Sequence, residues 1–231
     1  FVVFAQNHDQ VGNRMFGERL GTLVTVEDLK LAATAVMLSP HVPLLFMGEE
    51  YAETAPFRYF VSHSDAQLVE AVRRGRAREF VAFSWRGDPP DPQAEETFLT
   101  SKLNLELRRQ GMHAMLNRYY RELLRLRREV PALAALSKKQ MSVTRNDAAQ
   151  VLFLRRWQEG DEVILVLCFA AAGVQVKTDW PTGCWLKLLD SSGAGWNGPG
   201  AASLDEFDST GSLNLVLNPR SAVLYRRRLE N

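Results

Sequence analysis

The pattern of apolar positions divides the chain into a first part of mixed helix and strand and a second part built of short strands. In the first part, two continuous apolar runs, Phe1 to Ala5 and Val42 to Met47, flank a helical stretch that opens at Val26. The apolar residues on one face of that stretch are Leu29, Ala32, Ala33, Val36 and Met37. Continuous apolar runs are typical of strands covered on both faces, as in parallel sheets. The order predicts a parallel β-α-β unit.

Two further helices are predicted in the first part. Residues 65–83 read as a helix that carries several arginines, for which a solvated helix face is the simplest interpretation and a polybasic patch the alternative. Residues 112–129 give the clearest helical periodicity, and Pro131 follows them. The apolar positions at helical spacing there are Met115, Leu116, Tyr119, Leu123, Leu126 and Val130.

Beyond about residue 138 the pattern changes to short apolar or alternating runs separated by Gly, Pro, Asn and Asp. These runs lie near 140–144, 150–157, 162–169, 173–178, 184–190, 213–217 and 221–227. Such spacing predicts an antiparallel β-sandwich, so the expected domains are residues 1–138 and 139–231. Residues 191–212 read as a Gly/Ser-rich connection. The expected sandwich core includes Leu152, Leu154, Val163, Leu165, Leu167 and Leu224, because alternate residues share one face of a strand.

Composition narrows the function classes. The chain has 231 residues and a formal net charge of +1, which provides no long-range field for nucleic acid or anionic lipid. No apolar run approaches the length of a membrane span. Cys168 and Cys184 do not make a disulfide framework, and the four histidines show no metal-ligand spacing. We therefore expect no nucleic-acid or membrane partner, no metal, no cofactor and a cytoplasmic location.

The densest polar cluster, Gln6 to Arg14, directly follows the first predicted strand. In parallel α/β folds, active sites form at the carboxyl ends of strands. A carboxylate at Asp9 beside the imidazole of His8, with amides on both sides, suits the hydroxyls of a sugar. The alternative is an Asn/Asp/Gly turn that satisfies its own backbone. Spacing alone leaves both interpretations open.

The sequence around this cluster resembles a known superfamily. Phe4-x-x-Asn7-His8-Asp9 is similar to the seventh-strand motif of the α-amylase superfamily, and the longer string Gln6 to Arg14 resembles its trehalohydrolase branch. Segments that agree in order are Pro43 to Tyr51 (the eighth strand and its exit), Pro56 to Phe60, His63 to Asp65, Val72 to Arg76, Asp91 to Gln93 and Ser101 to Leu103. The resemblance continues through residues 112–131 and, more weakly, into the β region.

The resemblance implies the last two strands of a (β/α)₈ barrel followed by a β-sandwich. It implies a retaining glycoside hydrolase that cleaves the α-1,4 bond next to the trehalose end of maltooligosyltrehalose. Asp9 matches the third carboxylate, which stabilises the transition state, and His8 matches a neighbour that binds the same sugar. Asn7, Gln10 and Arg14 are then expected to bind substrate. Glu49 and Glu50, at the second strand exit, are expected to support the site.

The same resemblance places the nucleophile and the general acid on earlier barrel strands. We therefore expect this chain, which opens on Phe1 rather than Met, to be cut from a longer one and to be inactive alone. The alternative pairs Asp9 with Glu49 or Glu50 as nucleophile and acid. Barrel strands without their neighbours would expose apolar residues such as Phe1 and Leu44, so self-association through them is also expected.

Two other functions stay open. Trp180, Trp185 and Trp196 could make the β region a carbohydrate-binding domain without catalysis, although core packing is the more usual role of tryptophan. An α-glucan branching or debranching enzyme of the same superfamily is the other alternative. An exposed planar row of tryptophans would favour the binding domain, and product analysis would separate the enzymes.

Overall fold

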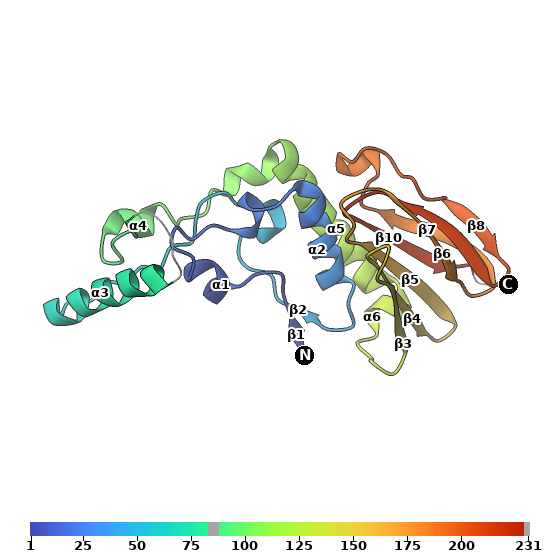
Figure 1. Ribbon diagram of the computed structural model, residues 1–231, viewed down its shortest axis with the longest axis horizontal. Helices are drawn as coiled ribbons and strands as arrows, with labels where there is room; N and C mark the ends of the chain where they lie inside the picture. The colour runs from blue at the N-terminus through green and yellow to red at the C-terminus, as the bar shows by residue number, and fades with distance from the viewer. Residues whose placement is uncertain (83–87, 229–231) are drawn as a thin grey trace. The chain divides into compact units, whose positions relative to one another are not determined.

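The computed structural model describes residues 1–82 and 88–228, and packing divides the chain into two compact units (Figure 1). The first, here called the β unit, comprises Phe1–Ala5, Thr25–Pro43 and Met115–Asn231. The second, the loop-rich unit, comprises Gln6–Val24 and Leu44–Ala114. Helices give way to strands between Ala134 and Met141. The division into residues 1–138 and 139–231 is a different one and stays a prediction.

The β unit contains most of the regular structure. Its strands are β1 (Val2–Val3), β2 (Val42–Pro43), β3 (Met141–Asn146), β4 (Val151–Gln158), β5 (Asp161–Cys168), β6 (Val174–Asp179), β7 (Gly183–Asp190), β8 (Glu206–Ser209), β9 (Ser212–Leu217) and β10 (Ser221–Arg227). Its helices are α2 (Val26–Met37), α6 (Pro131–Ala134), η4 (Ala194–Trp196) and all but the first turn of α5 (Gly111–Glu129). The fold is therefore mixed, with helices and parallel strands before a run of antiparallel strands.

Two antiparallel sheets form the β region. Six strands pair in the order β3-β4-β5-β10-β7-β8, and β6 pairs with β9. All seven predicted strands are present. Residues 191–212, interpreted as a Gly/Ser-rich connection, also contain η4 and β8, a strand that the sequence did not predict. Strand β8 has the sequence Glu-Phe-Asp-Ser at the edge of the sheet, and a short polar edge strand carries little apolar signal to detect.

The six-stranded sheet is covered on both faces. One face, together with β6 and β9, forms an apolar cluster that includes Phe153, Val166 and Trp185. On the other face, α2 packs on β10 and β5, and α6 packs on β4 and β5. All eight residues of β5 are consequently buried.

This arrangement corrects the expected core. Leu154, Val163, Leu165, Leu167 and Leu224 are buried and Leu152 is half-buried. None of the six belongs to the cluster between the sheets. Because side chains alternate along a strand, they share the opposite face, where the helices lie. The predicted alternation was right, and the partner assigned to that face was wrong.

Helix α5 confirms its predicted face, since Met115, Leu116, Tyr119, Leu123, Leu126 and Val130 are all buried. Helix α2 begins with a capping box between Thr25 and Asp28. Its buried face is Lys30, Leu31, Ala33, Thr34 and Met37, so the predicted Leu29, Ala32 and Val36 lie at the margin. Polar groups are tolerated in this face because they find partners. The Lys30 ammonium donates to the carbonyls of Ser191 and Trp196 at 2.7 and 3.0 Å.

Strands β1 and β2 pair in parallel, as predicted, through the two residue pairs Val2↔Val42 and Val3↔Pro43. The pairing is shorter than the apolar runs, and residues Leu44 to Met47 follow it without strand structure. Phe1 and Val2 are exposed, by 87% and 58%. Self-association through these residues stays a prediction.

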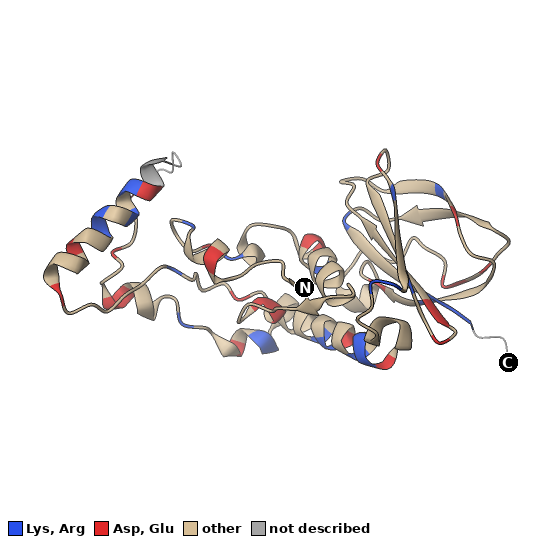
Figure 2. Ribbon diagram, turned by 90° about the horizontal axis from the view of Figure 1, so that it is seen from below, with Lys and Arg blue, Asp and Glu red and all other residues tan. Residues whose placement is uncertain are grey.

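The loop-rich unit holds α1 (His8–Gly12), η1 (Leu20–Thr22), η2 (Glu49–Tyr51), α3 (Ala66–Ala82), α4 (Glu95–Leu99) and η3 (Leu105–Arg109). Residue 83, the last of the helix predicted at 65–83, lies outside the described residues. Basic and acidic residues are interspersed along α3 (Figure 2). Arg73 pairs with Asp91, and Arg74 pairs with Glu70, so these arginines do not form an unpaired basic patch. No helix within the described ranges is long and apolar enough to cross a membrane.

Candidate functional site

The polar cluster after β1 folds as a capped turn of helix. The side-chain oxygen of Asn7 accepts the Gln10 N–H at 3.0 Å, and the Gln10 side chain accepts the Asn7 N–H at 3.1 Å. This reciprocal capping box fixes the start of α1. For Asn7 and Gln10 the turn interpretation thus has direct support, and what is left for a ligand is their side-chain N–H groups and one lone pair of each amide oxygen.

Asp9 and His8 have a different environment from their neighbours. The Nε2 atom of His8 lies 3.2 Å from Oδ1 of Asp9, and the two side chains are 71% and 72% exposed. A carboxylate can accept hydrogen bonds from several hydroxyls, and an imidazole can donate or accept. The pair therefore offers adjacent acceptor and donor groups at the end of a parallel strand.

Residues from later in the chain hold the α1 segment in place. The Phe57 ring packs against Gly12, and the Phe57 N–H donates to the Gly17 carbonyl at 2.8 Å. The Arg76 guanidinium donates to the Gly12 carbonyl at 2.9 Å and lies over the Tyr59 ring. The segments around residues 57 and 76 are among those matched by the family resemblance. Arg76 is largely buried, which the solvated-face interpretation of its helix did not predict.

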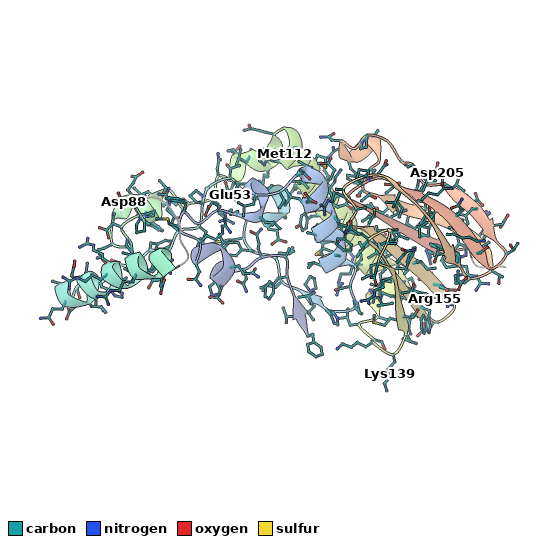
Figure 3. All side chains as sticks on the ribbon, viewed as in Figure 1. Glu53, Asp88, Met112, Lys139, Arg155 and Asp205 are labelled. Carbon is teal, nitrogen blue, oxygen red and sulfur yellow. The ribbon has the colours of Figure 1, made fainter. Side chains whose placement is uncertain are left out.

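A buried carboxylate that the sequence analysis missed organises the other strand exit. Glu53, labelled in Figure 3, is 1% exposed. Its oxygens accept hydrogen bonds from the Tyr51 hydroxyl at 2.9 Å, from the N–H groups of Thr54 and Ala55 at 2.8 Å, and from the Asn104 N–H at 2.6 Å. Burial, and then the hydrogen bond to Glu53, raise the pKa of Tyr51. Four donors compensate the desolvation of one carboxylate.

Arg19 completes this arrangement. Its guanidinium donates to the carbonyls of Ala55 and Met47, both at 2.7 Å, and lies over the Phe46 ring. Burial lowers the pKa of Arg19, and the negative charge of Glu53 opposes that shift. Two oppositely charged buried groups thus fix the loop from Phe46 to Ala55. The sequence around Glu53 offers no signal that distinguishes it from the neighbouring acidic pair Glu49-Glu50. No local pattern indicates which residues donate to its carboxylate.

Glu49 and Glu50 lie in η2 within this loop. Glu49 is buried, and its carboxylate accepts the Phe46 N–H at 3.2 Å. Glu50 is half-buried. Gly48 precedes them with φ of 84°, a left-handed conformation that glycine adopts without strain. A loop-supporting role for Glu49 agrees with this geometry, and pairing of Asp9 with Glu49 or Glu50 as catalytic partners stays a hypothesis.

The tryptophans of the β region do not form an exposed row. Trp180 and Trp185 are buried in the cluster between the sheets, and Trp196 is half-buried with its ring against Tyr119. Burial of the first two agrees with core packing and removes the observation that would have favoured stacking of these rings on sugar.

In the described part of the chain, the cysteines and acidic residues form neither a disulfide nor a metal site. Cys168 and Cys184 are both free, and burial raises the pKa of the Cys168 thiol. Within residues 1–82 and 88–228, no group of three or more His, Cys, Asp or Glu side chains could hold a metal ion.

Known sequences and structures place these residues in a family. The chain is 44% identical over 167 residues to the malto-oligosyltrehalose trehalohydrolase of Rhizobium sp. (strain M-11), a match that covers 71% of the chain and 27% of that protein. It is 45% identical over 168 residues to the enzyme of that name from Deinococcus radiodurans, covering 72% and 28%. The chain thus spans about a quarter of the length of these relatives. No family model matches it.

Solved structures agree. A Salmonella typhimurium protein assigned as an alpha amylase matches 99% of this chain with 35% of its own length, at 36% identity and a TM-score of 0.76. The alpha-amylase from H. orenii matches 98% of the chain with a TM-score of 0.57 and 15% identity, which shows likeness of fold alone. By its sequence, and with neighbours of the alpha-amylase fold, this chain belongs to the malto-oligosyltrehalose trehalohydrolase family.

Proposed function

We propose that this chain is the end of a (β/α)₈ barrel and the β-sandwich that follows it, in an enzyme that releases trehalose from maltooligosyltrehalose. The names of the relatives support the reaction. The single structural observation that supports the site is the exposed pair His8–Asp9 at the end of parallel strand β1. The substrate is an α-glucan whose last link, next to trehalose, is cleaved with retention.

In this proposal Asp9 binds hydroxyls of the sugar at the cleaved bond. Retaining glycosidases pass through an oxocarbenium-like transition state, and hydrogen bonds that strengthen there lower the barrier. The exposed carboxylate of Asp9 is suited to accept such bonds, and His8 can donate one beside it. Asn7 and Gln10 contribute binding through side-chain N–H groups that remain after capping. Arg14, whose guanidinium contacts the Glu18 carboxylate at 3.3 Å, contributes to binding from the same segment.

The same proposal makes residues 1–231 insufficient for catalysis. Cleavage needs a nucleophile and a general acid on opposite sides of the bond, about 5 Å apart. In the family these lie on earlier barrel strands, which do not occur in this sequence. Glu49 is engaged by a backbone N–H, and the Glu53 oxygens are fully occupied by four donors. We expect the chain by itself to bind without cleaving.

A chimera tests the proposal directly. The chain would replace the matching part of the Deinococcus radiodurans relative, to which it is 45% identical, and trehalose release from maltooligosyltrehalose would be assayed. We expect an active chimera, an inactive isolated chain, and a loss of about 10²–10³-fold in kcat for Asp9→Asn, as when one transition-state hydrogen-bonding group is removed.

The matched control is Asp88→Asn, an exposed carboxylate of the same unit, which should keep normal activity. Near-normal kcat for Asp9→Asn would refute the site. Release of longer or rearranged glucans in place of trehalose would favour the branching or debranching alternative. Turnover by the isolated chain would make Glu49 and Glu50 the first candidates for a catalytic partner of Asp9.

A further inference from the structure

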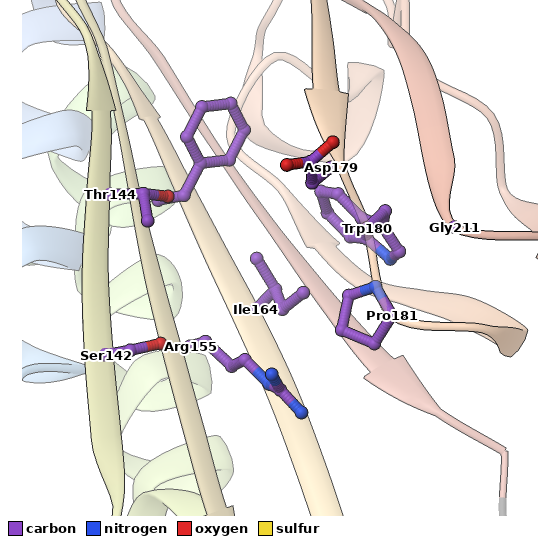
Figure 4. Close-up of a pocket in the computed structure, with 9 residues that line it drawn as sticks. Ser142, Thr144, Arg155, Ile164, Asp179, Trp180, Pro181 and Gly211 are labelled. Atoms are coloured by element: carbon purple, nitrogen blue, oxygen red, sulfur yellow. The ribbon is translucent and has the colours of Figure 1, made fainter.

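The two antiparallel sheets of the β unit differ in width, and the difference leaves a groove. Strands in a sheet lie about 4.8 Å apart, so six strands span about 24 Å and two strands about 5 Å. The pair β6-β9 therefore cannot cover the inner face of the six-stranded sheet completely. The uncovered part lies over β3, β4 and β5, beside the end of β6 (Figure 4).

The groove consists of two adjoining depressions of about 360 and 400 Å³. Both are lined by Thr144, Phe153 and Asp179. The first adds Ser142, Arg155, Ile164, Trp180, Pro181 and Gly211. These volumes fall in the range of small-ligand sites, about 300–1,000 Å³.

One wall of the groove is a row of polar side chains on paired strands. Ser142 lies opposite Arg155 and Thr144 lies opposite Phe153 in the β3–β4 register, so all four project to the same face. The hydroxyls of Ser142 and Thr144 are exposed. Arg155 donates through Nε to Glu162, which fixes the guanidinium and leaves its other N–H groups for a ligand.

The opposite wall carries an acceptor. Asp179, the last residue of β6, is exposed, and its carboxylate has no hydrogen bond or ion pair within the described part of the chain. In Figure 4, Asp179 and Pro181 stand across the groove from the strands that carry Thr144 and Arg155. The groove thus has hydroxyls and a guanidinium on one side and a carboxylate on the other.

The floor is apolar and rigid. Phe153, Ile164 and Trp180 are at most 6% exposed and belong to the core between the sheets. The Trp180 ring is fixed by edge-on contacts with Trp185, Phe207 and Tyr225. A ligand would therefore meet a shape that exists before binding, which lowers the entropic cost of binding.

The chemistry of the walls and floor limits the ligand class. In the first depression the Arg155 guanidinium is already paired with Glu162, so an anion would meet the Asp179 carboxylate without an unpaired cation, and a metal ion would find one carboxylate opposite a guanidinium. The second depression adds Arg145 and Lys177 to its lining. A wholly apolar ligand would desolvate the hydroxyls of Ser142 and Thr144 without replacing their hydrogen bonds. A neutral ligand with many hydroxyls and apolar C–H faces satisfies both the polar walls and the floor. We propose that this groove binds a segment of a linear α-glucan, separate from the site at Asp9.

The choice of an α-glucan rests on the proposed function, in which the substrate is a maltooligosaccharide chain. A second binding position on the β unit would hold a long substrate near the enzyme and would favour long chains over short ones. The groove side chains are then specificity determinants, without a part in bond cleavage.

Titration of the purified 231-residue chain with maltoheptaose, followed by calorimetry and by amide NMR shifts, tests the proposal. We expect millimolar binding that shifts the amides of Ser142, Thr144 and Asp179. Asp179→Asn should weaken the groove component about tenfold, the loss typical for a hydrogen bond to a charged group. Asp208→Asn, at an exposed carboxylate on β8, is the matched control and should bind like the wild type.

Absence of shifts at the groove, or equal binding by Asp179→Asn, would overturn the proposal even if the chain binds sugar elsewhere. An Asp9→Asn variant separates the two sites. If it removes shifts around α1 and leaves the groove shifts, both proposals stand. If maltoheptaose shifts only α1 residues, the groove is excluded and the proposed function is unaffected. If only the groove responds, the role of Asp9 is the one in doubt.

Discussion

The β unit and the loop-rich unit are stabilised in different ways. In the β unit, alternating strand residues bury apolar side chains on both faces of one sheet, so that β5 has no exposed residue. In the loop-rich unit, the segment from Phe46 to Ala55 is held by hydrogen bonds with two buried charged groups, Arg19 and Glu53. A repeated apolar pattern can be replaced at one position at moderate cost. When a loop is held by single polar side chains, replacing one of them leaves several backbone groups without a hydrogen-bond partner at once.

The difference also fits the proposed functions of the two regions. A site needs irregular backbone that presents side chains such as His8 and Asp9 to a ligand. Irregular backbone leaves N–H and carbonyl groups without secondary-structure partners, and these must be satisfied in another way. Glu53 satisfies three backbone N–H groups, and Arg19 satisfies two carbonyls.

The largest effect is expected at Arg156, a buried charged residue that binds backbone carbonyls within the largely apolar core of the β unit. Arg156 is 1% exposed, and its guanidinium donates to the carbonyls of Leu38, Leu133 and Ala135. Burial lowers its pKa to about 10. Arg156→Met should destabilise the protein by about 3–5 kcal/mol, because three carbonyls lose their donor. Urea unfolding would measure this, with Arg145→Met, an exposed residue, as the control. A loss below 1 kcal/mol would mean that water replaces the guanidinium.

The two-faced packing of the β unit predicts similar losses on both faces. Leu165→Ala, on the helix-covered face, and Leu215→Ala, in the cluster between the sheets, should each cost about 2–5 kcal/mol. Val216→Ala, beside Leu215 and 45% exposed, should change the unfolding free energy by less than about 0.5 kcal/mol. If Leu165→Ala were as mild as Val216→Ala, the helices would not cover that face in solution.

The loop-rich unit should respond locally to loss of one charge. Glu53→Gln keeps the shape of the side chain but replaces one acceptor oxygen with a donor, so we expect a cost of about 2 kcal/mol. The Thr54 and Ala55 N–H groups share one oxygen of Glu53, and the Asn104 N–H binds the other. Because glutamine keeps only one acceptor oxygen, hydrogen exchange should accelerate at the amides bound to the oxygen that is replaced. Glu50→Gln, at a half-buried neighbour, is the control. Unchanged exchange in Glu53→Gln would show that the loop does not depend on this carboxylate.

The smallest effect concerns the pH dependence of the β unit. Burial, followed by the nearby charges of Lys138, Arg156 and Arg127, lowers the pKa of His41 below its usual value near 6.5. The unfolded chain then binds a proton more readily than the folded chain. Stability should therefore be complete above about pH 6.5 and fall as the pH drops toward the lowered pKa. Unfolding of His41→Gln should lack this component, whereas His63→Gln should retain it. Equal pH profiles for wild type and His41→Gln would refute the assignment.

The sequence by itself determined the elements whose signal is local. Alternation located seven strands of the β region, and the string from Gln6 to Arg14 marked the candidate site and the family. Helical spacing identified the buried residues of α5 except Tyr120. Only the tertiary structure decided which elements pack against each face of a strand or helix. Five leucines and one valine were assigned to a core between sheets, but helices from other parts of the sequence cover their face: Leu152, Leu154, Val163, Leu165, Leu167 and Leu224.

The same limit applies to the polar residues. Glu53 resembles any other glutamate until Asn104, 51 residues later, donates to it, and Lys30 lies on an apolar helix face because carbonyls beyond residue 190 receive its ammonium. Periodicity records how a side chain is oriented relative to its own element. It contains no information about which element arrives on that side, because long-range packing depends on the shape and hydrogen-bonding needs of the whole chain.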